Sequence, residues 1–210
     1  MDWVTISSLA TAGGTLVLAV ATFGATRSAN RSARLSELAL RQQLRPVLVH
    51  SQLDDPIQKI MFAGGHWVRV QGSGAAVEHE DGTVYMSMSL RNVGNGIGVL
   101  MGWHVWPSIE PGVRQEPVAV DDFRSQTRDL YIPANGIGLW QGALRDDSEE
   151  LHGQMVGVTS EPRPFLIDLL YSDHVGGQRS ISRFSVIPMD EGRWMCAVTR
   201  HWDLDGHELA

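Results

Sequence analysis

The sequence has very little cysteine, and this limits the classes of protein to which the chain can belong. Cys196 is the single cysteine among 210 residues, so an intramolecular disulfide framework is excluded. The chain also lacks an excess of basic residues, since 17 basic side chains stand against 24 acidic ones and the net charge is −7. A general nucleic-acid binder needs a basic surface to neutralise phosphates. We therefore expect no nucleic acid among the partners.

Motifs for catalysis and for metal binding are also lacking. Gly94, Gly96 and Gly98 have the spacing of a dinucleotide-binding loop, but strand-like segments lie on both sides where the motif needs a strand and then a helix. The eight histidines include no pair at the helical i, i+4 spacing and no cysteine partner, so no metal site is predicted. We predict no catalytic residue and no cofactor. An enzyme, such as a hydrolase that uses scattered Asp and His residues, is the alternative interpretation.

Charged side chains are absent from one long segment near the start of the chain. Residues 3–26 are 24 residues without a charge, and about 20 apolar residues are enough for a helix to cross a bilayer. Trp3 lies at one end, where an indole prefers the membrane interface, and is a candidate lipid contact. A cleaved signal peptide is the alternative, but it needs a basic start and this chain begins Met1-Asp2. We predict a transmembrane helix over residues 1–26.

The segment that follows is basic. Residues 27–45 contain five arginines and one glutamate, without Gly or Pro, which predicts a juxtamembrane helix or stalk with a charge of +4. Basic flanks stay on the cytoplasmic side, so we expect a single-pass plasma-membrane protein with its N-terminus outside and residues 46–210 in the cytoplasm. The candidate contacts to anionic lipid are Arg27, Arg31 and Arg34. A topology signal with a spacer is the simpler interpretation of the same arginines.

Beyond Pro46 the hydrophobic pattern changes from helical to twofold. About eight strands and no helix are expected, which predicts an antiparallel β-sandwich, loosely immunoglobulin-like, over residues 46–210. A small barrel is the alternative, because closure of a sheet cannot be derived from one sequence. The dipeptides Asn95-Gly96 and Gly176-Gly177 each predict a two-residue hairpin turn, and Asn135-Gly136 suggests a third.

The hairpin registers place particular residues opposite one another. In the first hairpin Leu90 would face Met101, and Tyr85 would face Trp106 on the side away from the core. Two large aromatic rings on that side predict a cover, provided by the chain itself or by a partner. The second hairpin would set Leu169 against Phe184. Asp173 and His174 near its end make a polar group that can contact a partner. The candidate interaction face comprises Tyr85, Trp106, Asp173 and His174.

The overall plan resembles a loose group of uncharacterised bacterial single-pass membrane proteins with an N-terminal span, an Arg-rich stalk and a cytosolic β domain. The likeness rests on residues 3–26, Arg45-Pro46, residues 90–96, residues 176–184 and Arg200-His201-Trp202. It implies no known activity. We expect a membrane-anchored interaction or scaffold module, with membrane lipid and an unidentified protein as partners and a homo-oligomer as a further possibility. An exported β domain behind a signal peptide is the other alternative.

Overall fold

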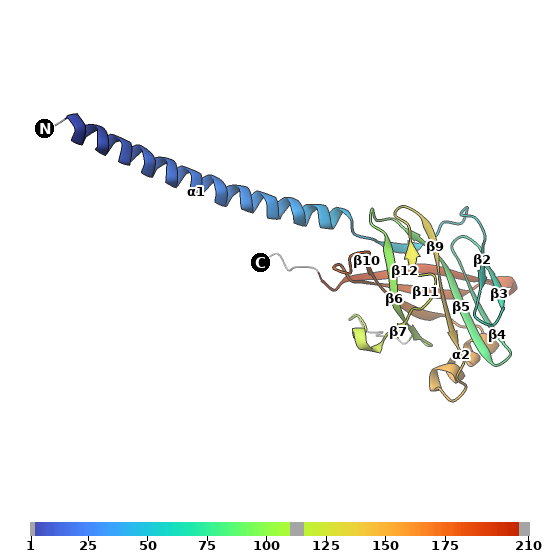
Figure 1. The fold of residues 1–210 in the computed structure, drawn as a ribbon. Helices are drawn as coiled ribbons and strands as arrows, with labels where there is room; N and C mark the ends of the chain where they lie inside the picture. Colours follow the sequence, from blue (N-terminus) through green and yellow to red (C-terminus); the bar gives the residue numbers. More distant parts are fainter. Residues whose placement is uncertain (1–2, 110–115, 206–210) are drawn as a thin grey trace. The chain divides into compact units, whose positions relative to one another are not determined.

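The structure is a computed structural model that describes residues 3–109 and 116–205, without the side chains of residues 3–11 and 191. The helices are α1 (Trp3–Gln43), α2 (Glu150–Ser160) and the short 3-10 helices η1 (Val120–Asp122) and η2 (Asp190–Gly192). The strands are β1 (Leu48–His50), β2 (Gln58–Met61), β3 (Trp67–Val70), β4 (Gly74–Glu80), β5 (Thr83–Asn92), β6 (Gly98–Trp106), β7 (Arg124–Ser125), β8 (Tyr131–Ile132), β9 (Ile137–Leu144), β10 (Phe165–Asp173), β11 (Ser180–Pro188) and β12 (Trp194–Asp203) (Figure 1).

The chain divides into two compact units, residues 1–43 and residues 44–210. The described part of the first unit is the long helix α1, which contains residues 3–26 of the predicted span and most of the predicted stalk. It ends before Pro46, as expected from the restriction that proline places on the preceding residue. Among the described side chains, no helix combines the length and the apolar character that a membrane crossing requires. Residues 3–11 of the predicted span have side chains outside the described part of the chain.

The second unit is mainly β, as predicted, and is built on one antiparallel sheet of ten strands. The strands follow the order β1-β5-β4-β12-β11-β10-β6-β7, with β9 paired to β5 and β8 paired to β6. A separate two-stranded sheet contains β2 and β3. The main hydrophobic core draws side chains from both ends of the large sheet. Trp103 of β6 and Trp140 of β9 meet edge to face with ring centroids 5.6 Å apart, so the sheet curves around one core.

The prediction of a first hairpin at Asn95-Gly96 was wrong. β5 pairs with β1, β4 and β9, whereas β6 pairs with β7, β8 and β10. Neither Asn95 nor Gly96 has the positive φ that a type I′ turn requires. The segment instead crosses from one part of the sheet to another, and the Asn92 side chain holds it by accepting from Gly94 N at 3.0 Å and donating to Gly96 O at 2.7 Å.

The second hairpin is confirmed, with its register shifted by two residues. Ile167, rather than Leu169, lies opposite Phe184. A shift of two keeps every side chain on its predicted face, because side chains alternate with period two. The connection is longer than the predicted two-residue turn because the Asp173 carboxylate accepts from Gly177 N at 2.8 Å and Gln178 N at 3.3 Å. The third suggested turn, at Asn135-Gly136, joins β8 to β9 without a ladder between them.

Helix α2 corrects the prediction that residues 46–210 contain no helix. Its sequence contains Gly and β-branched residues, which have low helix propensity. The side chains of His152, Met155 and Val158 are buried, and the two apolar ones pack in the main core. Tertiary packing therefore decides the helical state of this segment, and a local pattern does not reveal that packing.

Cys196 lies in the core, with 1% of its surface exposed. Burial raises the pKa of the Cys196 thiol to about 12. In the unfolded chain a cysteine ionises near pH 8.5, so between the two values only the unfolded state loses the proton. The folded state is therefore favoured below pH 8.5, and this contribution is lost as the pH rises toward 12.

We expect the Cys196→Ala variant to show a weaker loss of stability at high pH than the unmodified chain. The Cys196 thiol alone should lower the free energy of unfolding by up to about 1.4 kcal/mol per pH unit above pH 9. Chemical denaturation of both proteins between pH 7 and pH 10.5 measures the difference in slope. Other groups that titrate in this range, such as Tyr171, whose pKa burial also raises, contribute to both proteins. Equal slopes would contradict the buried protonated thiol.

Candidate functional site

Large apolar side chains are exposed along the described part of α1. Five of these side chains are 66–71% exposed: Leu16, Val17, Leu18, Val20 and Phe23. Within the same helix, Thr22 and Thr26 donate their hydroxyls to the carbonyl oxygens four residues earlier, at 2.8 and 2.9 Å. These hydroxyls need no water, which is the arrangement that makes threonine tolerable in an apolar medium.

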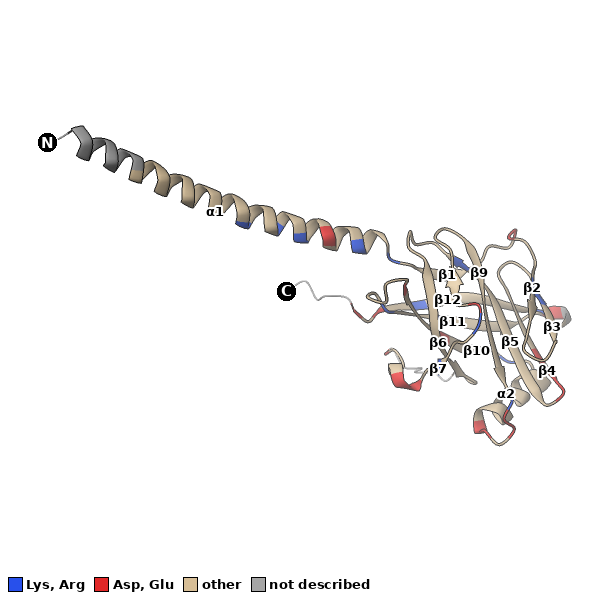
Figure 2. Cartoon of the chain, viewed as in Figure 1, with Lys and Arg blue, Asp and Glu red and all other residues tan. Residues whose placement is uncertain are grey.

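The predicted lipid-contact arginines lie just beyond this apolar stretch. Arg27, Arg31 and Arg34 are exposed and follow the spacing i, i+4, i+7, so they share one face of α1 (Figure 2). Further along, Arg41 forms an exposed ion pair with Glu37 at 2.7 Å. The side chain of Trp3, the fourth predicted lipid contact, lies outside the described residues.

The four residues of the predicted interaction face occupy separate environments. Tyr85 is covered by the β2–β3 sheet, with Phe62 and His66 at 4.9 and 4.1 Å between ring centroids. The cover that the aromatic pattern predicted is thus provided, at Tyr85, by the chain itself. Trp106 is not opposite Tyr85, because β5 and β6 are unpaired; its indole N–H donates to Asp168 at 3.0 Å.

The two polar members of that face also differ from each other. Asp173 is nearly buried, and its carboxylate holds the turn between β10 and β11. His174 is exposed in the same turn. Of the four predicted residues, His174 is the one that presents its side chain freely to solvent. The structure therefore brings together Asp173 and His174, which are neighbours in sequence, but not the aromatic pair.

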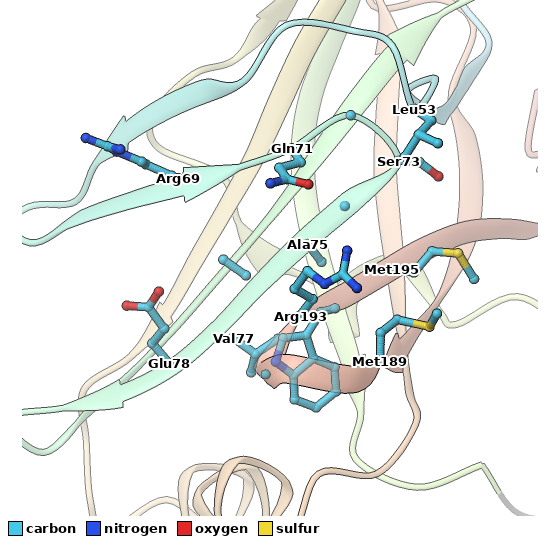
Figure 3. Close-up of a pocket in the computed structure, with 15 residues that line it drawn as sticks. Leu53, Arg69, Gln71, Ser73, Ala75, Val77, Glu78, Met189, Arg193 and Met195 are labelled. Carbon is cyan, nitrogen blue, oxygen red and sulfur yellow. The ribbon is translucent and has the colours of Figure 1, made fainter.

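Sequence reasoning missed a groove of about 290 Å³ beside β4. One wall is β4 itself, a second is the segment from Met189 to Met195, and a third comes from β3 and the loops next to it (Figure 3). Arg69 and Arg193 contribute guanidinium groups and Glu78 contributes a carboxylate. Its size is at the lower end of the range for small-molecule sites.

Apolar side chains surround the same groove and are partly uncovered. Leu53, Met189 and Met195 have exposed fractions of 82%, 47% and 37%. Val77 and Trp194 are nearly buried and form its floor. The sequence held one signal for this site, the alternation of Ala75, Val77 and His79, but the glycines on both sides favoured a loop.

A cluster of titratable side chains lies close to this groove. The His66 ring is stacked on Tyr85 with its Nε2 atom 3.0 Å from Glu78 and its Nδ1 atom 3.1 Å from Glu80. Among the described residues, this is the group of three that could hold a metal ion. Each ring nitrogen lies next to a carboxylate, so the cluster connects the β2–β3 turn to β4.

Comparisons with known proteins give no relative on which to base an assignment. A scan against protein-family models, a search of curated proteins and a search of solved structures each returned no match. The geometry of α1 and of the β4 groove is therefore the basis for assigning a function.

Proposed function

We propose that the chain is a membrane-anchored interaction module with its β domain facing the cytosol. The exposed apolar side chains of α1 are the observation that supports this proposal most directly. Apolar surface left in water costs about 25 cal/mol per Å², and surfaces of this kind are normally covered by lipid or by protein. A membrane span over residues 1–26 and an immunoglobulin-like sandwich form for the β domain are parts of the same proposal.

Lipid fits α1 better than a second helix does. Arg27, Arg31 and Arg34 form a basic face directly after the apolar stretch, which matches the anionic headgroups at the edge of a bilayer. Leu35, Leu38 and Leu40 do not continue a heptad pattern, so a coiled coil has little support. The β domain has 12 basic and 22 acidic side chains, a charge of −10, and an anionic surface repels it. Such repulsion would leave the domain available to a protein partner.

The proposal predicts that apolar residues in the first half of α1 hold the protein in membranes. We expect the full chain to sediment with membranes and to resist a high-pH carbonate wash. The triple variant Leu16→Glu, Val17→Glu, Leu18→Glu should appear mainly in the soluble fraction, because a carboxylate within a span costs about 2.5–3.5 kcal/mol per residue.

A matched control lies on the same helix. Replacing Leu35, Leu38 and Leu40 with Glu introduces the same charge at exposed positions of the stalk, and this variant should stay in the membrane fraction. The proposal is wrong if the first triple variant remains bound to membranes, or if both variants leave together. Retention of the intact N-terminus in membrane-bound protein separates this function from the alternative of an exported domain.

A further inference from the structure

The edge of β4 is only partly used by the sheet. β12 pairs with β4 at two positions, Trp194 with Ala75 and Met195 with Gly74. The Cys196 N–H donates to the Ser73 carbonyl at 3.0 Å, next to these two pairs. In an antiparallel ladder with these pairs and this bond, the backbone N–H and C=O of Ala75 point toward β12.

Val77 comes two residues later, so its N–H and C=O point to the same side as those of Ala75. The continuing register would place Gly192 opposite Val77, but residues 190–192 form the 3-10 turn η2. Among the described residues, no strand is paired with β4 on this side beyond Ala75. The backbone of Val77 therefore faces the groove, while β5 covers the opposite edge of β4.

Main-chain groups of this kind are matched by another extended chain. A peptide added to an open edge gains backbone hydrogen bonds, and the pockets beside the edge select its side chains. In this groove Leu53, Met189 and Met195 offer an apolar rim. Arg69 and Arg193 place two guanidinium groups in the groove against the single carboxylate of Glu78, although the domain as a whole has a net negative charge. A peptide that carries a carboxylate next to an apolar side chain would complement both the guanidinium groups and the apolar rim.

We propose that the groove beside Val77 binds an extended segment of a partner protein that carries an apolar and an acidic side chain, as an added strand of the sheet. This inference rests on the proposed interaction function and names its binding surface, but it does not depend on the membrane anchor. Failure of the α1 variants to leave the membrane would therefore not bear on the groove, and the converse also holds.

The test uses the full chain in detergent and a displayed library of random octapeptides. We expect the enriched peptides to combine an acidic residue with apolar β-branched residues. A synthetic copy of one enriched peptide should slow hydrogen exchange at the Val77 amide at least about tenfold, since that N–H would become hydrogen-bonded. Arg69→Glu should weaken binding at least about tenfold, because it replaces attraction with repulsion at an exposed position.

The matched control is Arg128→Glu, which makes the same charge change at an exposed arginine that does not line this groove. It should leave affinity within about twofold. Several outcomes would overturn the proposal. These are a library without enrichment, an enriched peptide that leaves Val77 exchange unchanged, and equal weakening by the two charge reversals. If exchange at the Val77 amide slows as the protein concentration rises, in the absence of peptide, the edge binds a second copy of this chain instead.

Discussion

Replacing Asp168 with Ala is expected to lower the free energy of unfolding by about 3–5 kcal/mol, the range for removal of one partner of a buried ion pair. The Asp168 side chain is fully buried on β10 and lies directly opposite Arg183 of β11. Its two oxygens accept from Arg183 Nε at 2.6 Å and Nη2 at 2.7 Å, and one of them also accepts from the Trp106 indole at 3.0 Å.

The cost arises mainly from the cation that remains. Arg183 is 4% exposed. Its Cζ atom lies over the rings of Trp106 and Trp202, at 5.5 and 4.9 Å from the ring centroids. Without the carboxylate, this charge stays buried without its counter-ion. Chemical denaturation followed by tryptophan fluorescence measures the effect on the full chain.

Two further variants define the cause. The double variant Asp168→Leu, Arg183→Leu should recover at least half of the loss, because a well-packed apolar pair replaces the ionic pair. Glu149→Ala removes the partner of Arg124 at a more exposed ion pair, where both side chains are more than one-third exposed, and should cost less than about 1 kcal/mol. If Asp168→Ala costs no more than Glu149→Ala, the buried pair does not contribute as the geometry indicates.

This ion pair illustrates what the sequence could and could not predict. The alternation in residues 165–188 correctly gave a hairpin and its apolar face, since both follow from local period. The two-residue shift that brings Asp168 opposite Arg183 depends on how Asp173 shapes the turn, which a dipeptide pattern does not reveal. The predicted register would instead set Asp168 opposite Ser185 on a partly solvated face, whereas the observed pair with Arg183 is buried.

The same limit explains the missed groove. Its walls come from three stretches of the sequence, near residue 53, at 69–78 and at 189–195, and its open edge exists because β12 leaves β4 at η2. Long-range strand pairing is decided by the whole sheet, so no local pattern marks an unpaired edge. In contrast, the composition of residues 3–45 predicted helix for this part of the chain, and the structure has one helix from Trp3 to Gln43.

Gly96→Ala is the second change with a large expected effect, a loss of about 2–3 kcal/mol in the free energy of unfolding. A Cβ at Gly96 would meet the Leu44 carbonyl, and one at Gly94 would meet the Arg45 carbonyl. These contacts are with backbone, which cannot rotate away as a side chain can. The glycines therefore allow the start of the β domain to pack against the crossing between β5 and β6. For a domain of this size the thermal midpoint should fall by roughly 5–10 °C.

Gly177→Ala is the matched control, because a Cβ there meets nothing within 4 Å and its φ lies outside the left-handed range. It should change stability by less than about 0.5 kcal/mol. The Asn95→Ala variant distinguishes between two structures of this segment, the observed crossing from β5 to β6 and the hairpin turn that the sequence predicted. A type I′ turn would hold Asn95 at positive φ, where alanine costs about 1 kcal/mol, whereas the observed crossing predicts little change. A large loss from Asn95→Ala together with a small one from Gly96→Ala would favour the hairpin over the crossing, because the two geometries place the steric demand on different residues.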